Sequence, residues 1–394
     1  MEVSLRPSWR QLDLEALDHN VCALQEASGG AGILGVVKAD AYGHDAPTVA
    51  RRLERDVAIH GLVVVGLDEA LALLEAGIDG RILVLCGGVA PSHEALAKLA
   101  SSGLTPVLSS RRQVDGAAEL EWFDGVHLLV DTGMARLGVG LNEVEDCVRE
   151  LSEACIDLRG IATHFVESEC AGSPFTAEQM DRYAFAASRV WSFFPQARPH
   201  VANSAASLHW QTESAEWRQR HPELALALDD PQRHLVRPGG ALYGVDLSEY
   251  VGAGEQAPRS VSPVKPVLSL GCQIVQRRSL PEGATVGYGA LWRAERPSQI
   301  ALLPIGYADG VPGHLDDAAH VDIGGARAPI VGAVSMDLLT VDVTDLDPAT
   351  AAVGSEAWLL HPLGPSLEDW VRWSGRKPYE LLCGWSRRVP LRSA

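Results

Sequence analysis

Short apolar runs alternate with longer amphipathic segments through residues 1–245 of the chain. Within one longer segment, Leu71, Leu74 and Ile78 recur at the spacing of a single buried helix face. The pattern predicts helices over residues 11–27, 67–76, 141–154 and 177–193. It predicts strands over residues 33–38, 61–65, 81–86, 105–108, 126–130, 158–164, 199–202 and 235–242.

Repeated strand–helix alternation is typical of an α/β protein with a (β/α)8 TIM-type barrel, in which each parallel strand is followed by a helix. An open doubly wound sheet is the alternative fold. The GxGxxG fingerprint that favours that alternative follows none of the predicted strands. We therefore expect a barrel over residues 1–245. The polar stretch 209–234 within it reads as an extended crossover or a surface insertion of no assigned role.

The pattern changes near residue 260, where short apolar runs are separated by Gly, Pro and Asp turns and almost nothing is helical before residues 366–375. This change predicts a mostly β domain over residues 263–394. A linker over residues 246–262, rich in Gly, Ser, Glu and Pro, would join it to the barrel. The strands expected in the β domain cover residues 264–275, 284–287, 299–304, 328–334, 339–343 and 357–360.

Composition narrows the classes of function and location. Hydrophobic residues make up 46% and charged residues 21% of the chain, as in an ordinary soluble globular protein. A formal net charge of −18 argues against nucleic acid or an anionic membrane as a partner. The seven cysteines form no CxxC pair, which favours reduced thiols in a cytoplasm over disulfides or a metal site. The N-terminus carries no apolar signal core, and no apolar run approaches the roughly 20 residues of a membrane span.

Polar residues collect where the predicted barrel strands end, which is where barrel enzymes carry their chemistry. Lys38 ends the first strand, so it is either a lysine reaching solvent or a candidate Schiff-base amine. His164 ends the sixth strand and is either a packed core histidine or a site residue. Asn203 and Ser204 follow the seventh strand.

The eighth strand carries Arg237, Gly239 and Gly240. The two glycines, together with Ser204, fit either a phosphate site or a simple turn. A guanidinium inside an apolar strand needs a planar partner, which is either a carboxylate or a cofactor ring.

A lysine, a phosphate site and an arginine together suggest pyridoxal 5′-phosphate. An arginine cannot hand the pyridine ring a proton, because its pKa exceeds about 12. Such a ring is a weaker electron sink, which suits reactions that only exchange the α-proton.

Short motifs run in order along nearly the whole chain. They stand at residues 36–44 (VVKADAYGH), 131–134 (DTGM), 163–165 (THF), 203–206 (NSAA), 236–239 (VRPG), 286–289 (VGYG), 305–310 (IGYADG), 331–337 (VGAVSMD), 379–380 (YE) and 388–390 (RVP). In this order and on this layout, the chain resembles the alanine racemases. The resemblance implies a homodimeric enzyme that supplies D-alanine for cell-wall synthesis.

The resemblance also implies residue roles. Lys38 would hold the cofactor and act on one face of the substrate's α-carbon, and Tyr288 of the other subunit would act on the opposite face. His164 and Arg237 would form the network that favours the Tyr288 phenolate. The other implied residues are Tyr42, Ser204, Gly239, Gly240 and Tyr379 for the phosphate, Asn203 beside them, Arg136 and the Met336 backbone for the substrate carboxylate, and Tyr307 with Tyr379 at the entrance.

One position departs from the family pattern. Many members have a lysine, often carboxylated, two residues before the DTGM motif, where it orients the arginine that matches Arg136. This chain has Leu129 there, which can neither be carboxylated nor hydrogen bond. We expect altered substrate preference or rate rather than loss of activity.

Other functions remain open from the sequence. They are a racemase of broader or shifted specificity, such as one for serine, a decarboxylase or retro-aldol lyase on the same fold, and a non-catalytic cofactor-binding protein. The Tyr288 motif favours racemisation, because a decarboxylase does not need a second base for the same purpose.

Overall fold

The computed structural model describes residues 6–55, 59–85, 92–170, 172–210, 216–247, 263–385 and 387–392. The chain forms two compact units. The barrel unit is Glu15–Lys265, and the β unit combines Met1–Leu14 with Pro266–Ala394. The expected barrel began at residue 1, whereas the described residues 6–14 belong to the β unit. Most of the expected linker, residues 248–262, lies outside the described residues.

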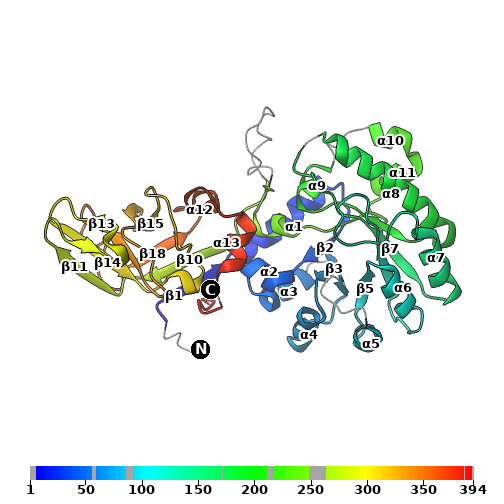
Figure 1. The fold of residues 1–394 in the computed structure, drawn as a ribbon, viewed down its shortest axis with the longest axis horizontal. Coiled ribbons are helices and arrows are strands. Elements are labelled where there is room, and N and C mark those ends of the chain that lie inside the picture. The colour runs from blue at the N-terminus through cyan, green and yellow to red at the C-terminus, as the bar shows by residue number, and fades with distance from the viewer. Residues whose placement is uncertain are drawn as a thin grey trace. The chain divides into compact units, whose positions relative to one another are not determined.

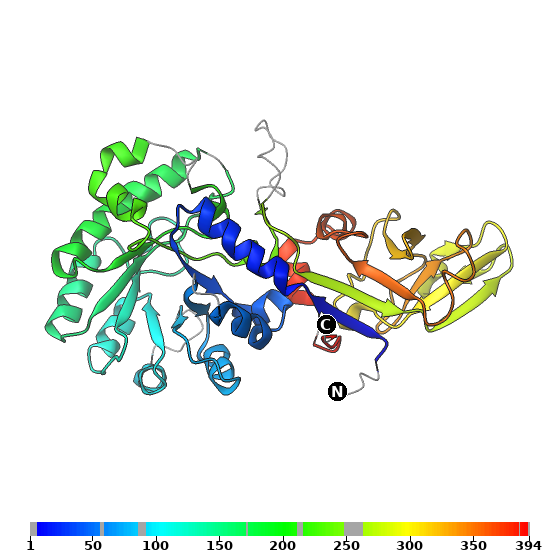
Figure 2. The same cartoon turned by 180° about the vertical axis from the view of Figure 1, so that it is seen from behind.

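Eight parallel strands form the centre of the barrel unit, in the spatial order β8-β7-β6-β5-β4-β3-β2-β9. The sheet nearly closes, because the Arg237 N–H, just beyond β9, donates to the Ala202 carbonyl, just beyond β8, at 2.8 Å. The predicted barrel is confirmed (Figures 1 and 2). Its strands are β2 (Gly32–Val36), β3 (Ile59–Val64), β4 (Ile82–Val84), β5 (Thr105–Leu108), β6 (Val126–Leu129), β7 (Leu158–Ala162), β8 (Arg198–His200) and β9 (Leu235–Val236).

Amphipathic helices cover the barrel, and several start at a side-chain cap. In α8, for example, Ser173 accepts the Thr176 N–H while Pro174 occupies the first turn. In α4 the buried residues are Ala70 and Leu73, whereas the sequence pattern pointed to the neighbouring leucines. The helices are α1 (Leu14–Ala27), α3 (Ala46–Glu54), α4 (Leu67–Glu75), α5 (His93–Ser101), α6 (Arg111–Ala117), α7 (Val144–Glu153), α8 (Pro174–Phe193), α9 (Ser204–Leu208), α10 (Glu216–Arg220) and α11 (Pro222–Asp229).

Two segments near the end of the barrel unit differ from expectation. The eighth strand is only two residues long, because Pro238 and the glycines after it turn the chain into the 3-10 helix η2 (Gly240–Tyr243). The stretch 209–234 contains α10 and α11, and it buries Trp217, Leu224 and Leu228. It is therefore partly helical and has an apolar face.

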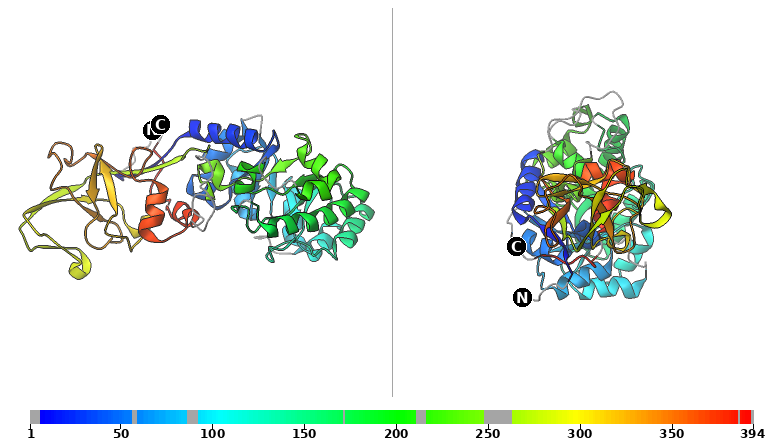
Figure 3. Two further views of the ribbon diagram at one scale, coloured as in Figure 1. Left: turned by 90° about the horizontal axis from the view of Figure 1, so that it is seen from above. Right: turned by 90° about the vertical axis from the view of Figure 1, so that its left-hand side faces the viewer.

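The β unit contains antiparallel sheets, and Figure 3 shows both units from two further directions. The larger sheet has the order β1-β10-β18-β15-β16 and the smaller one β11-β14-β17, while β12 pairs with β13. Its elements are β1 (Ser8–Leu12), β10 (Leu268–Gln273), β11 (Gln276–Leu280), β12 (Thr285–Val286), η4 (Tyr288–Ala290), β13 (Trp292–Arg293), β14 (Ser298–Leu303), η5 (Tyr307–Asp309), β15 (His320–Ile323), β16 (Ala326–Pro329), β17 (Leu339–Asp342), β18 (Glu356–Leu360), α12 (Leu367–Ser374) and α13 (Pro378–Gly384).

The helix predicted over residues 11–27 is α1, which begins only at Leu14, because residues 8–12 form the edge strand β1 beside β10 (Figure 2). Trp9 of β1 is 7% exposed and meets Trp358 edge to face, with the ring centroids 5.8 Å apart. Gly271 lies beneath them, and a Cβ there would stand 3.0 Å from both rings. The two indoles therefore fasten β1 to the sheet.

We predict that Trp9→Ala lowers the stability of the β unit by about 3–5 kcal/mol, because it empties the space beside Trp358. Denaturant unfolding followed by circular dichroism measures this loss. Leu363→Ala is the control, since Leu363 is 87% exposed, and it should change the stability by less than about 0.5 kcal/mol. Equal effects of the two variants would contradict a structural role for β1.

Candidate active site

The carboxyl ends of the parallel strands bring the predicted barrel residues to one end of the unit. Lys38 follows β2, His164 follows β7, and Arg237 follows β9. The β2 and β9 ends are adjacent, because the Val36 N–H donates to the Pro238 carbonyl at 3.0 Å. Lys38 therefore stands next to the Gly239–Gly240 segment.

The backbone after Lys38 makes an unusual turn. In α2 (Lys38–Gly43), residues 39–42 all have φ between +51° and +56° and ψ between +39° and +50°, so this is a left-handed turn. Residues with a Cβ disfavour this conformation by about 1–2 kcal/mol each. The turn buries the Tyr42 ring, which packs against Tyr243 with the centroids 5.1 Å apart.

The Tyr42 hydroxyl lies against Gly239. A Cβ on Gly239 would come within 2.3 Å of that oxygen, so only glycine fits there. The Ser204 Oγ accepts the N–H groups of Gly239 at 2.9 Å and Ala241 at 3.3 Å. These bonds leave the proton of the Ser204 hydroxyl to donate. Two hydroxyl groups on a glycine-lined backbone fit a phosphate group.

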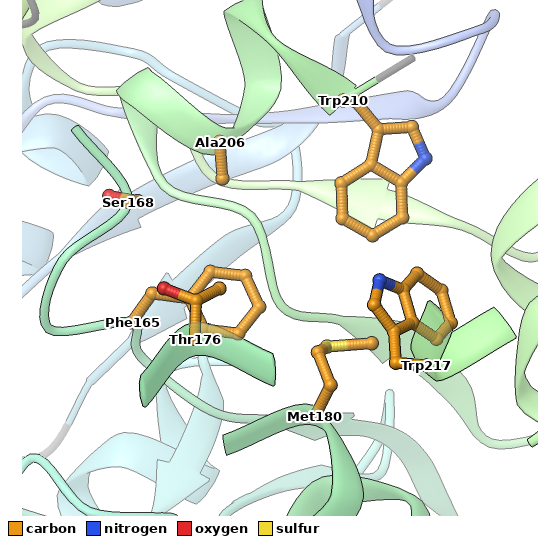
Figure 4. A pocket seen from close by; sticks show the side chains of 7 residues that line it. All are labelled: Phe165, Ser168, Thr176, Met180, Ala206, Trp210 and Trp217. Atoms are coloured by element: carbon orange, nitrogen blue, oxygen red, sulfur yellow. The ribbon is translucent and has the colours of Figure 1, made fainter. Parts of the chain in front are cut away.

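Asn203 supports this cradle from behind. Its Oδ1 accepts the Ala206 N–H at 3.2 Å, which caps α9, and the Ser168 hydroxyl at 2.8 Å. Beyond them lies a small cavity of about 10 Å³, the room of one water molecule. Figure 4 shows Trp210 and Trp217 on one side of it, facing Phe165 and the helix α8 residues. Trp210 and Trp217, from the stretch 209–234, therefore line the same cavity as Ser168, which donates to Asn203.

The Arg237 guanidinium is buried and uncompensated by a carboxylate among the residues described. It donates to the carbonyl oxygens of His200 and Thr163, and to the His200 Nδ1 at 3.0 Å. Burial lowers the pKa of Arg237 to about 10, so the group stays charged at neutral pH. The geometry does not form the buried Arg–carboxylate pair that was the alternative explanation of this residue.

Two buried histidines continue below Arg237, and the sequence did not single them out. The His127 Nδ1 and the His200 Nε2 are 2.9 Å apart. Burial, aided by Arg237, lowers the pKa of His200 well below its ordinary value. Because the His200 Nδ1 accepts from Arg237, its Nε2 carries the proton and donates to His127.

The two rings fit only because β7 has a glycine opposite them. A Cβ at Gly160 would stand 2.3 Å from the His127 Nδ1 and 3.0 Å from the His200 Nε2. A glycine inside a predicted strand was the available sequence signal for this close approach.

His164 lies among cations. Burial and then the charges of Arg237, Arg136 and Lys38 lower the pKa of His164 to about 3, so it is neutral. The positive charge of these three neighbours favours an anionic ligand. Arg136 itself is exposed and makes no hydrogen bond or ion pair with the described part of the chain.

Leu129 is the last residue of β6 and is 9% exposed. Its backbone carbonyl accepts the Val139 N–H at 2.9 Å, but its side chain offers Arg136 no polar partner. The departure from the family pattern thus leaves a buried position whose side chain can neither donate nor accept a hydrogen bond.

The other predicted residues belong to neighbouring loops of the β unit. The Tyr307 N–H donates to Ser335 and the Ala308 N–H to Met336, both at 3.0 Å. Gly306 has no room for a side chain, since a Cβ would lie 2.2 Å from the Ser335 oxygen. Large apolar side chains are exposed here: Tyr288 by 78%, Leu291 by 76%, Met336 by 53% and Tyr307 by 49%. Tyr379 lies in α13.

Comparison with known proteins places this geometry in a family. A sequence model of the alanine racemase N-terminal domain matches residues 12–246, and a model of the alanine racemase C-terminal domain matches residues 267–393. The chain belongs to the alanine racemase family. The alanine racemase of Sorangium cellulosum is 37% identical over 404 aligned residues, which cover 98% of each chain.

Solved alanine racemases share the fold. The biosynthetic alanine racemase of Pseudomonas aeruginosa superposes with a TM-score of 0.77 at 31% identity, covering 98% of this chain and 99% of that one. The alanine racemase of Bartonella henselae with covalently bound pyridoxal phosphate superposes with a TM-score of 0.78 at 28% identity, covering 97% and 98%.

Among the residues described, no group of three or more His, Cys, Asp or Glu side chains is arranged to hold a metal ion. No described helix is long and apolar enough to cross a membrane.

We predict that Gly160→Ala disrupts the histidine pair beneath Arg237. The added methyl overlaps both rings, so we expect a loss of about 1–3 kcal/mol of stability and weaker cofactor binding. Thermal unfolding and titration of pyridoxal phosphate into apo-protein measure the two effects. Gly313→Ala is the control, because a Cβ there meets nothing within 4 Å. If both variants behave alike, the pair does not depend on Gly160.

Proposed function

We propose that this protein interconverts L- and D-alanine, with pyridoxal phosphate held by Lys38. The observation that carries the proposal is the convergence of Lys38, the Tyr42–Ser204–Gly239 cradle and the Arg237 guanidinium at one end of the barrel of an alanine racemase homologue. When bound, the cofactor draws electrons from the amino acid and so acidifies its α-proton.

The barrel residues hold and tune the cofactor. Tyr42, Ser204, Gly239 and Gly240 bind its phosphate, and Tyr379 joins them, while Asn203 fixes the segment behind. Arg237 would donate a hydrogen bond to the pyridine nitrogen of the cofactor. Its partners are neutral carbonyls and a neutral histidine, so nothing there relays a proton toward the ring. With such a partner, the ring nitrogen of a bound cofactor would stay unprotonated, which would limit the reaction to exchange of the α-proton.

Two bases work on opposite faces of the α-carbon. Racemisation requires them, because a proton removed on one side must be returned on the other. The Lys38 amine serves one face and the Tyr288 phenol the other, with His164 and Arg237 stabilising the phenolate.

Tyr288 comes from the second subunit of a homodimer. Support comes from the exposed Tyr288, Leu291, Tyr307 and Met336 on neighbouring loops, because such an apolar patch marks an interaction surface. Each active site is then shared between two chains.

The substrate is held by its carboxylate. Arg136 and the Met336 backbone bind that group, and Tyr307 with Tyr379 narrows the entrance to favour a small side chain. Leu129 leaves Arg136 unoriented, which favours a pocket of broader specificity that also admits serine. We place the enzyme in the cytoplasm, where its D-alanine feeds cell-wall synthesis; the six cysteines that the structure describes are all free.

Tyr288→Phe should slow racemisation by roughly 10²- to 10⁴-fold, and unequally in the two directions, since it removes the base of one face only. Initial rates from each enantiomer measure this, and an equal small loss would remove its role as a face-specific base.

Lys38→Ala should lose the long-wavelength absorption of lysine-bound cofactor. Mixing the Lys38→Ala and Tyr288→Phe variants should raise the activity above that of either one through mixed dimers. No recovery despite demonstrated subunit exchange would count against a shared site.

Leu129→Lys should change the ratio of kcat/KM for serine over alanine by roughly tenfold, because an oriented Arg136 holds the substrate carboxylate more strictly. Measurements with and without bicarbonate separate carboxylated from free lysine at this position. Leu129→Met is the control, since it keeps the volume and offers no hydrogen bond. Unchanged specificity and rate in Leu129→Lys would show that this position does not govern the pocket.

A further inference from the structure

The left-handed turn after Lys38 needs external support to persist. Residues 39–42 are all residues with a Cβ in the left-handed region, and only Gly43 of this segment is a glycine. Without tertiary contacts such a run would relax toward right-handed conformations. Any relaxation would rotate the backbone that carries the Lys38 side chain.

The support next to Lys38 is the carboxylate of Glu69, in the first turn of α4. Its Oε1 accepts the Ala39 N–H at 2.7 Å. Its Oε2 accepts the N–H groups of Val65 at 2.9 Å and Gly66 at 3.3 Å. One side chain thus ties the amide that follows Lys38 to the loop that follows β3.

These two loops are neighbours because their strands pair. β2 and β3 are parallel with Val36 opposite Val63, and the Val37 N–H donates to the Val63 carbonyl at 2.9 Å. The ladder ends one residue before Lys38. Beyond this point the Glu69 carboxylate links the two segments by accepting the next free backbone N–H, that of Ala39.

Within the turn, the Ala41 N–H donates to the Val37 carbonyl at 2.9 Å, and further contacts act on its far end. The Asp40 Oδ1 accepts the Ala46 N–H at 3.0 Å, and the His44 Nδ1 is 3.0 Å from the Tyr42 carbonyl oxygen. They hold the residues that lead into α3 and the Tyr42 ring. The Ala39 N–H, next to the lysine, donates to the Glu69 carboxylate.

We propose that Glu69 is a positioning residue for Lys38. It holds the left-handed turn at the lysine and so keeps the amine aimed at the cofactor and the α-carbon. This role rests on the proposed function of Lys38. A misplacement of about 1 Å at a reacting group reduces rates by roughly a hundredfold, so the tie matters for chemistry more than for substrate binding.

Glu69→Gln separates the tie from side-chain size. An amide has one acceptor oxygen, and its NH2 group would face a backbone N–H, so Gln cannot serve Ala39 and the Val65–Gly66 pair together. A matched control exists in Glu54, whose Oε1 accepts the N–H groups of Asp79 at 2.9 Å and Gly80 at 2.6 Å. That interaction precedes β4, at the opposite end of the barrel.

The experiment compares wild type, Glu69→Gln and Glu54→Gln as full-length proteins. Amide hydrogen exchange of the peptide over residues 38–44 reports the turn in apo-protein. Titration with pyridoxal phosphate, followed by reductive trapping and mass analysis of the Lys38 peptide, reports attachment of the cofactor. Steady-state kinetics with alanine give kcat and KM, and thermal unfolding gives stability.

For Glu69→Gln we expect faster exchange over residues 38–44, cofactor attachment weakened by roughly tenfold, and kcat lowered by roughly 10- to 100-fold with KM changed by less than about threefold. Glu54→Gln should match wild type in all three. If Glu69→Gln is too unstable to purify, Glu69→Asp, which keeps the charge with a shorter reach, takes its place.

The proposal is overturned if Glu69→Gln exchanges and attaches cofactor like wild type, or if both variants lose attachment equally, since that is a general stability effect. These readouts do not require alanine turnover. A wild-type protein that attaches cofactor at Lys38 but does not racemise alanine would contradict the proposed function and still test Glu69.

Discussion

The buried guanidinium of Arg237 is the constraint on which the barrel unit depends. Its backbone N–H bridges the two ends of the sheet to Ala202, and its side chain lies in the barrel interior. A buried cation requires acceptors, and here the acceptors are carbonyl oxygens and the neutral His200. His200 in turn requires His127, and both require the missing side chain of Gly160. One charge at the closure point therefore fixes the choice of residues on three other strands.

The β unit is organised around an opposite charge. The Asp309 carboxylate is fully buried and accepts from Arg6 at 2.7 Å and from the Gly306 N–H at 3.0 Å, with Arg388 3.6 Å away. It joins both ends of the chain to the loop that carries Tyr307. That loop also donates hydrogen bonds to the carbonyl oxygens of Ser335 and Met336, so the carboxylate supports the backbone that carries Tyr307.

The sequence predicted those features that local patterns encode. The barrel strands followed from apolar runs, and the residues at their carboxyl ends followed because parallel strands share one end. Features that depend on distant partners were missed: β1 pairs with β10 across more than half of the chain, and His127 meets His200 on another strand. The left-handed turn was also missed, since alanine, aspartate and tyrosine carry no signal for positive φ. Glu69 was not singled out either, because its hydrogen bond to Ala39 joins two loops that are 30 residues apart in the sequence.

Burial lowers the pKa of Arg237 and also that of several histidines, so the barrel unit loses stability in acid. Burial lowers the pKa of His127, His164 and His234 to about 3, and that of His60 to about 4, from an ordinary value of 6.5. A group whose pKa is lower in the folded state binds fewer protons there than in the unfolded chain, so stability rises with pH across that interval. The contribution of these histidines is complete above pH 6.5 and is lost progressively as the pH falls toward 3. Because His164 and the His127–His200 pair lie beside Arg237, protonation would place new positive charge against a cation that has no carboxylate to offset it among the described residues. Acid should therefore disturb the cofactor end of the barrel through the interaction that also closes it.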